Sequence, residues 1–187
     1  MIYLCRHGET FLEQQKRKQG HINSELTLLT PQGYEDSKIV ASKIKDKNIE
    51  VIYTSPLLRT IQTTTIIMDN LPVKPKVVIE PELIEMLFGE WEGLRKEEIE
   101  VGWPGELEER ERIGRWNYRV PSGESYRDVS ERTAKWWDEK SRYLPQNSLL
   151  VSHNVVAMSL RKHVYDLRVE QALALSHTHK EVWELKY

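Results

Sequence analysis

The sequence has only one cysteine, Cys5, among its 187 residues. One cysteine cannot close a disulfide within the chain, so the fold does not depend on a disulfide framework. No apolar run approaches the ~20 residues of a membrane-spanning helix. The chain starts directly with strand-forming residues, which we interpret as the absence of a signal peptide. These absences predict a protein of the reducing cytoplasm with no membrane partner.

The chain also has no large excess of positive or negative charge. Lys and Arg number 27 against 29 Asp and Glu, for a formal net charge of −2, and no basic block interrupts the chain. A nearly balanced charge gives no field that would attract a polyanion or an anionic membrane surface, so we expect no nucleic-acid partner. The length is that of one ordinary domain with a core of its own, and we predict a single domain over residues 1–187. The composition leaves a homodimer open.

Short apolar segments alternate with helical segments along most of the chain. We predict strands at 2–5, 50–55, 77–79, 148–153 and 181–187, and helices at 31–47, 56–69, 124–143, 155–165 and 170–174. Thr30 and Pro31 supply the cap and first position of the helix 31–47, whose Tyr34, Ala41 and Ile44 we expect in the core. Residues 11–24 are polar and predicted irregular. This order is typical of an α/β fold, a three-layer α/β/α sandwich with a mostly parallel central sheet.

Residues 81–121 interrupt the alternation. Gly, Trp and charged residues follow one another there without clear periodicity. We interpret this segment as an excursion that covers one edge of the sheet. Its tryptophans, Trp91, Trp103 and Trp116, either line a pocket or pack in the core, and the second is the commoner role of Trp.

Three predicted strands end in cationic or imidazole side chains. The first runs into Arg6 and His7, the second is followed by Arg59, and the fourth ends at His153. In parallel sheets the carboxyl ends of the strands lie at one edge, where ligands bind. Two guanidinium groups and two imidazoles at that edge predict a site for a phosphate group. Gly8 has no side chain and lets another group approach this backbone closely.

The segment Arg6-His7-Gly8-Glu9-Thr10 resembles the signature of the histidine phosphatase superfamily, the phosphoglycerate mutase-like proteins. Further blocks resemble the same family in the same order: 55–60 (Ser-Pro-Leu-Leu-Arg-Thr), 83–85 with 88–93, 121–125 (Pro-Ser-Gly-Glu-Ser) and 152–153. The resemblance covers most of the chain. It implies the phosphoglycerate mutase-like fold and a phosphatase that works through a phosphohistidine without a cofactor.

The resemblance also assigns roles to individual residues. His7 is the expected nucleophile, since a neutral imidazole attacks phosphorus near neutral pH without a metal. Arg6 and Arg59 are expected to clamp the phosphate, and His153 to donate to the transferring group. Glu85 is the expected acid that protonates the leaving oxygen. Three nearby carboxylates could take its place: Glu82, Glu90 and Glu92.

The loop after the first block matches the family less well. Thr10, Gln19 and Gly20 resemble the segment that closes over the phosphate, through backbone N–H groups and a hydroxyl. Many members carry Asn six residues after the nucleophile, where this chain has Glu13, an anion that repels phosphate unless it pairs with a cation. Asn154 stands where members often have Gly. These departures concern the fine contacts to the substrate.

A metal role is not expected for the remaining histidines. His177 and His179 alternate as metal ligands on a strand do, but no carboxylate or cysteine motif accompanies them in the sequence. We interpret them as structural or solvent-exposed and predict no metal site.

The sequence thus predicts a phosphomonoesterase that acts on a small phosphorylated metabolite. A cofactor-dependent phosphoglycerate mutase is the first rival interpretation, although such mutases are typically longer. The arginines at 110, 112, 115 and 119 keep it open, because they could bind a carboxylate or a second phosphate. A phosphate-binding module without catalysis and a zinc hydrolase have less support in the sequence. The substrate itself is not specified.

Overall fold

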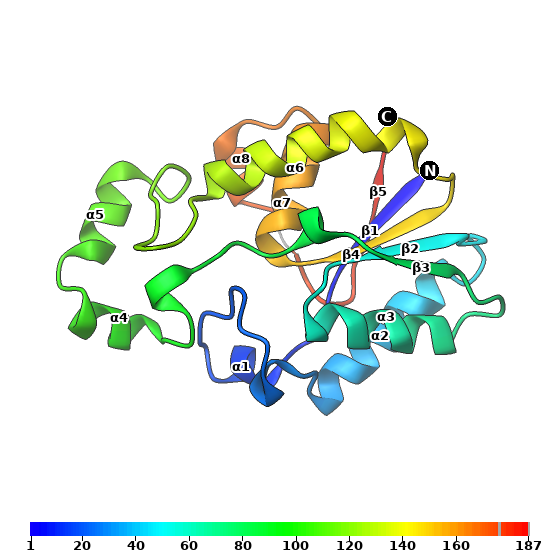
Figure 1. Ribbon diagram of the computed structural model, residues 1–187, viewed down its shortest axis with the longest axis horizontal. Helices are drawn as coiled ribbons and strands as arrows, with labels where there is room; N and C mark the ends of the chain where they lie inside the picture. Colours follow the sequence, from blue (N-terminus) through cyan, green and yellow to red (C-terminus); the bar gives the residue numbers. More distant parts are fainter. Residues whose placement is uncertain (176, 187) are drawn as a thin grey trace.

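Five strands form one sheet with the order β3-β2-β4-β1-β5 (Figure 1). The computed structural model describes residues 1–175 and 177–186. The strands are β1 Ile2–Arg6, β2 Val51–Thr54, β3 Lys76–Ile79, β4 Ser148–Ser152 and β5 Val182–Leu185. The first four run parallel, and β5 is antiparallel to β1. The predicted mostly parallel sheet is confirmed; the predicted end of the last strand at residue 187 lies outside the described residues.

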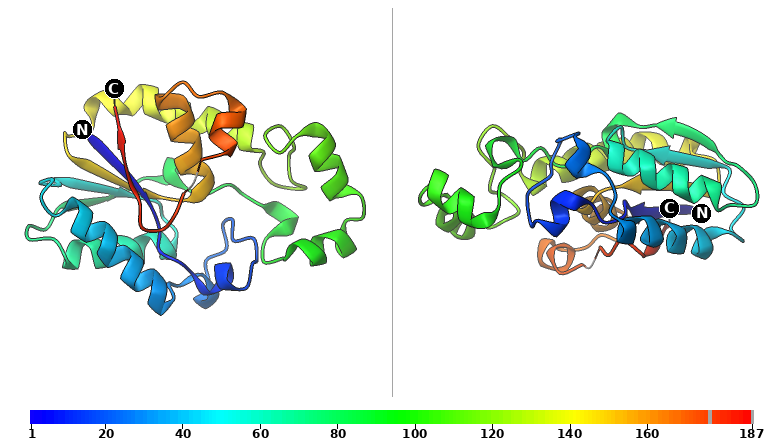
Figure 2. Two further views of the ribbon diagram at one scale, coloured as in Figure 1. Left: turned by 180° about the vertical axis from the view of Figure 1, so that it is seen from behind. Right: turned by 90° about the horizontal axis from the view of Figure 1, so that it is seen from below.

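Helices cover both faces of this sheet (Figure 2). The α-helices are α1 Phe11–Gln14, α2 Pro31–Ile44, α3 Leu58–Asp69, α4 Lys96–Gly102, α5 Glu106–Ile113, α6 Tyr126–Lys140, α7 Asn154–Val164 and α8 Val169–Leu173. Single 3-10 turns occur at Glu25–Thr27, Pro81–Leu83, Gly89–Trp91 and Ser141–Tyr143. The pair α2 and α3 packs on one face, and α6 and α7 pack on the other. In the described part of the chain no helix is long and apolar enough to span a bilayer.

The three layers follow from the alternation of side chains along the central strands. Ile2 and Leu4 of β1 belong to a core cluster with α6 and α7, whereas Tyr3 and Cys5 belong to a second cluster with α2. Successive strand residues point to opposite faces, so one fully apolar strand builds both cores at once. The central strands are therefore covered on both faces, whereas the edge strand β3 is mostly exposed.

Two local predictions were wrong. Tyr34 is 49% exposed, because the buried stripe of α2 runs through Gly33, Ser37, Val40 and Ile44 and Tyr34 lies next to it around the helix. Residues 11–24 are also not all irregular, since α1 forms directly after Thr10. Thr10 and Glu13 make a reciprocal capping box there, and the spacing Thr-x-x-Glu is a helix-start signal that the sequence already contains.

The excursion at 81–121 is built on buried aromatic residues. Trp91 and Trp116 are nearly fully buried in the α6–α7 core, and Trp91 stacks on Tyr118 with ring centroids 5.6 Å apart. Their role is packing, as in most proteins. The helices α4 and α5 extend beyond the sheet on the side of α1 (Figure 1).

The backbone after β1 lies directly against α2. A Cβ atom added to Gly8 would be 2.2 Å from the carbonyl oxygen of Gly33, and one added to Gly33 would be 2.1 Å from that of Glu9. The Gly8 N–H donates to Thr63 Oγ1 of α3 at 3.0 Å. Glycine at position 8 thus allows close approach of a helix, which holds the segment after β1 between α2 and α3.

We expect Gly33→Ala to destabilise the protein by at least about 2 kcal/mol, because the added methyl overlaps a backbone oxygen that cannot rotate away. The matched control is Gly102→Ala in α4, where an added Cβ meets nothing within 4 Å. That change should be neutral or stabilise by up to about 1 kcal/mol through helix propensity. Urea unfolding midpoints compare the two variants. Equal midpoints would show that the contact between the two backbones is not tight.

Candidate functional site

The carboxyl ends of three strands bring the predicted cations and imidazoles together. The rings of His7 and His153 are 5.2 Å apart, centroid to centroid. Arg59, in the first turn of α3, donates from Nε to His153 Nδ1 at 3.2 Å. Arg6, His7 and Arg59 line a cavity of about 200 Å³. The convergence predicted from the strand ends is present.

His7 is held in one tautomer. Its Nδ1 lies 2.8 Å from the Gly8 carbonyl oxygen, which can only accept, so Nδ1 carries the proton and Nε2 keeps its lone pair. The ring is buried, and this burial, together with Arg59 and Arg6, holds the pKa of His7 well below its usual range. At neutral pH the imidazole is therefore uncharged. A neutral ring with a basic Nε2 is chemically suited to attack an electrophile.

Arg59 is a fully buried cation. Its guanidinium donates to the carbonyl oxygens of Gly20 at 2.8 Å and Ile22 at 3.3 Å. These bonds tie the loop at 20–22 to the first turn of α3. They also hold one edge of the planar guanidinium group, which fixes its position in the cavity wall.

His153 is fully buried, and its two ring nitrogens contact protein groups. Nδ1 accepts from Arg59, so Nε2 carries the proton and donates to Ser55 Oγ at 2.8 Å. Burial lowers the pKa of His153 well below its usual value, with Arg59 and Arg6 adding to the effect. The ring packs beside His7 and does not line the cavity itself. To donate to a phosphoryl group, Nε2–H has to leave Ser55.

Glu13 pairs with Arg6. One carboxylate oxygen accepts from the Arg6 guanidinium, and the other accepts from the Thr10 backbone N–H at 3.2 Å. Arg6 also donates to the His177 carbonyl oxygen at 3.2 Å, while its buried Nε has no acceptor among the described residues. The anion that the sequence places near the phosphate site thus neutralises part of the predicted clamp.

Of the three residues predicted to close over a phosphate, two line the cavity and the third lies behind them. Gln19 and Gly20 line the cavity. Gly20 has a φ of +50°, and an added Cβ would lie 2.0 Å from Glu92 Oε1, so glycine is required there. Thr10 is fully buried behind them and donates its hydroxyl to Gln19 Oε1 at 2.9 Å. Thr10 therefore caps α1 and holds the side chain of Gln19.

Glu85 is a buried carboxyl group that lines the same cavity. It accepts from the Met86 N–H at 2.9 Å, and burial still raises its pKa against this bond and against the attraction of Arg59. Its own carbonyl oxygen accepts from His21 Nε2 at 2.7 Å, and Arg132 donates to the Ile84 carbonyl at 2.7 Å. A carboxyl group with a raised pKa and a fixed backbone is suited to donate a proton.

The three carboxylates that could have replaced Glu85 lie outside the cavity. Glu90 accepts from Trp103 Nε1 and Ser122, and Glu92 accepts from the backbone N–H of His21. Glu82 is exposed. None of the three lines the cavity that holds Glu85.

Several cavity residues were not expected from the sequence. Lys18, Phe88 and Arg115 line the cavity from separate loops, and Tyr126 lines it from the start of α6. Lys18 Nζ lies 5.5 Å from the centre of the Phe88 ring. Burial lowers the pKa of Lys18, and Arg110 and Arg115 lower it further. These residues make part of the cavity wall cationic and part of it aromatic. No local signal marks these residues, because only tertiary packing brings the loop at 18 to the excursion.

His179 contacts His7 across the end of the sheet. Its Nδ1–H donates to the His7 carbonyl oxygen at 2.6 Å, and its Nε2 lies 3.7 Å from Glu13 Oε2. The cause is topological: β5 pairs antiparallel with β1, Cys5 opposite Val182, so the chain that enters β5 passes the end of β1. No carboxylate motif accompanies this histidine in the sequence, but the fold supplies Glu13.

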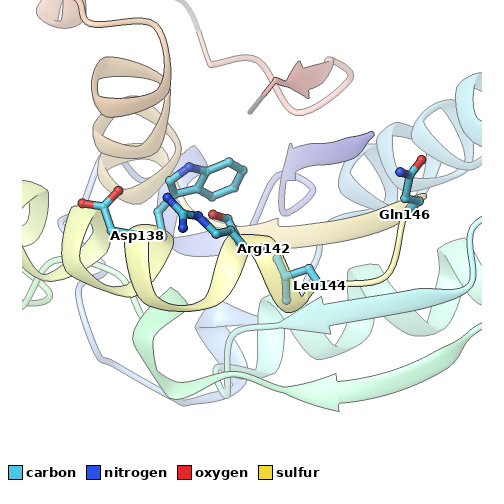
Figure 3. A pocket seen from close by; sticks show the side chains of 6 residues that line it. Asp138, Arg142, Leu144 and Gln146 are labelled. Atoms are coloured by element: carbon cyan, nitrogen blue, oxygen red, sulfur yellow. The ribbon is translucent and has the colours of Figure 1, made fainter.

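A choice of candidate site by cavity volume alone would have favoured a different hollow. A hollow of about 560 Å³ lies at the end of α6, between Asp138, Arg142, Leu144 and Gln146 (Figure 3). Asp138 pairs there with His163 at 2.7 Å. This hollow has one guanidinium group, that of Arg142, and no histidine among its lining residues, so its chemistry points to no reaction.

Comparison with known proteins agrees with this geometry. Residues 2–187 match the model of the histidine phosphatase superfamily, branch 1. This chain belongs to that family. The superfamily predicted from the Arg-His-Gly block is thereby confirmed.

Relatives carry several activities in their names. A human 6-phosphofructo-2-kinase/fructose-2,6-bisphosphatase 4 is 34% identical over 91% of this chain, which spans only 34% of that relative's length. The probable phosphoglycerate mutase GpmB of Erwinia tasmaniensis is 33% identical over 82% of this chain and 69% of its own. The solved structure of the α-ribazole phosphatase from Shigella flexneri is 27% identical, with a TM-score of 0.79, over 92% of this chain and 83% of its own.

Glu13→Gln should strengthen the inhibition of any phosphatase activity by inorganic phosphate. Gln keeps an acceptor for the cap of α1 but removes the negative charge beside Arg6. We expect the inhibition constant for phosphate to fall about 5-fold, or roughly 1 kcal/mol. Glu9→Gln is the matched control, because Glu9 accepts from Gln14 and Thr30 and does not line the cavity. An unchanged or higher constant in Glu13→Gln would contradict the assignment of Glu13 as a competing anion.

Proposed function

We propose that this protein hydrolyses phosphomonoesters of small metabolites through a phosphohistidine on His7. The observation that carries the proposal is the fixed tautomer of His7, which lines one cavity together with two guanidinium groups and a protonatable carboxyl group. Membership of the histidine phosphatase superfamily and a phosphatase among the structural neighbours support it. The cavity of about 200 Å³ suits a phosphate with a small remainder.

In the first half-reaction, Nε2 of His7 forms a bond to phosphorus while the ester P–O bond breaks. The leaving oxygen takes the proton of Glu85, which becomes a carboxylate. Arg6 and Arg59 balance the charge on the phosphoryl oxygens, and the unused Nε of Arg6 gains an acceptor. Phosphoryl transfer asks mainly for such positioning and charge balance, which this chain's own side chains provide.

In the second half-reaction, water attacks phosphorus and the N–P bond breaks. Glu85 takes a proton from the water and regains its acid form, and His7 returns to its neutral tautomer. The products are an alcohol and inorganic phosphate. The burial that raises the pKa of Glu85 lets one group serve first as acid and then as base.

A phosphoglycerate mutase remains the second candidate because of two further cations in the cavity lining. Lys18 and Arg115 line the cavity in addition to the proposed phosphate clamp, and they would attract a carboxylate or second phosphate of a substrate. A relative named as a probable phosphoglycerate mutase is consistent with it. A mutase passes the phosphoryl group of His7 to an acceptor alcohol in place of water, so the fate of that group separates the two candidates.

The test is phosphate release from an activated aryl phosphate in the presence of EDTA, with the wild type beside His7→Ala. We expect release by the wild type and a loss of at least about 10³-fold in the variant, since the covalent route requires the imidazole. Release that survives in His7→Ala would contradict the choice of nucleophile. Transfer to a phosphoglycerate acceptor without release would favour the mutase.

Glu85→Gln should separate good from poor leaving groups. With an alkyl phosphate we expect a loss of about 10²-fold or more, and with nitrophenyl phosphate a much smaller loss, because an acidic phenol leaves without a proton. Wild-type kcat/KM for the alkyl ester should fall as pH rises through the raised pKa of Glu85, since only the protonated form donates. This alkaline decline should be absent in Glu85→Gln. Equal losses with both esters would contradict the acid role.

A further inference from the structure

Three potential metal ligands converge beside the end of β1. They are His7 after β1, Glu13 in α1 and His179 just before β5, and one ligand atom of each lies within 4.8 Å of the others. His179 Nε2 lies 3.7 Å from Glu13 Oε2. No sequence spacing brings these groups together, because β1 and β5 meet only through the sheet.

Both imidazoles are oriented as metal-binding histidines are. Nδ1–H of His7 donates to the Gly8 carbonyl and that of His179 to the His7 carbonyl, so each ring keeps its Nε2 lone pair. Backbone carbonyls that fix the tautomer in this way are the usual outer partners of histidine ligands. Glu13 Oε2 is likewise fixed by the Thr10 N–H.

We propose that Zn²⁺ or a similar divalent transition-metal ion binds reversibly between His7 Nε2, His179 Nε2 and Glu13 Oε2, and that it inhibits the protein by occupying the lone pair of His7. Two imidazoles and one carboxylate are a known ligand set for zinc with one open position. Mg²⁺ and Ca²⁺ prefer oxygen ligands and should not compete. Only the inhibition rests on the proposed phosphatase function; the binding does not.

The distances and charges set the strength of this site. Zinc bonds of about 2.0 Å put tetrahedral ligands roughly 3.3 Å apart, so ligand atoms within 4.8 Å of one another have to move closer by at most about 1.5 Å. Arg6 holds the other oxygen of Glu13 and repels a dication. The site should therefore bind more weakly than a structural zinc site and release its ion to EDTA. Metal and phosphate should exclude each other, because both need His7.

The experiment measures Co²⁺ binding by visible absorption and Zn²⁺ inhibition of aryl phosphate hydrolysis, each in wild type and variants. His179→Asn can keep the hydrogen bond to the His7 carbonyl but removes one ligand. His163→Gln is the matched control, because His163 also pairs with a carboxylate, Asp138, away from the cavity. We expect one Co²⁺ per wild-type chain, at least 10-fold weaker binding and inhibition in His179→Asn, and no change in His163→Gln. Inhibition is expressed relative to each variant's own rate.

Two further variants keep the result decisive. Glu13→Gln should also weaken Co²⁺ binding, and this variant takes the place of His179→Asn if His179→Asn does not fold. His7→Ala should weaken Co²⁺ binding by a similar factor. Co²⁺ binding to this variant can be measured whether or not the protein is a phosphatase, so the metal site is tested independently of the proposed function. Binding that is unchanged in His7→Ala, or equally weakened in His163→Gln, would overturn the proposal. So would wild-type protein that takes up no Co²⁺.

Discussion

The buried guanidinium of Arg59 is the constraint on which the site depends. Removing a cation from water costs several kcal/mol unless hydrogen bonds and an opposite charge replace the lost hydration. Here the replacement is made by two loop carbonyls and the Nδ1 of His153, and among the described residues no carboxylate is ion-paired with Arg59. The arrangement joins α3, the loop at 20–22 and the end of β4 in one network. It leaves a fixed positive charge that an incoming phosphate dianion would balance.

Burial and the same network together set the protonation of the neighbouring side chains. Burial lowers the pKa of His7 and of His153, and the positive charges of Arg59 and Arg6 lower both further, so the two imidazoles stay neutral. A neutral His7 is nucleophilic and a neutral His153 can donate only from Nε2. Two effects act on the pKa of Glu85 in opposite directions: burial raises it, and the positive charge of Arg59 lowers it. Because burial prevails, Glu85 keeps its proton to a higher pH than an exposed glutamate does, and in the proposed reaction that proton goes to the leaving oxygen.

The residues that could be predicted share a local origin. Arg6, His7 and His153 directly follow apolar strands, so the strand pattern and the geometry of parallel sheets suffice to bring them together. Glu85 has no such pattern and was found only through family resemblance. Lys18, Arg115 and His179 could not be found by either route, since their positions depend on how loops pack across the end of the sheet. The antiparallel pairing of β5 is the physical step that a sequence pattern could not supply.

Glu13 shows how a single change of residue alters the balance of the site. An amide at this position would leave both guanidinium groups to the phosphate, whereas the carboxylate already satisfies part of Arg6. A phosphate that binds must displace this carboxylate or accept its repulsion, and either one weakens product binding as well as substrate binding. In the proposed hydrolysis the last bound species is phosphate, so weaker binding of that product would favour turnover. Glu13 Oε2 already lies 3.7 Å from His179 Nε2, so the carboxylate has an imidazole beside it as well as the Arg6 guanidinium.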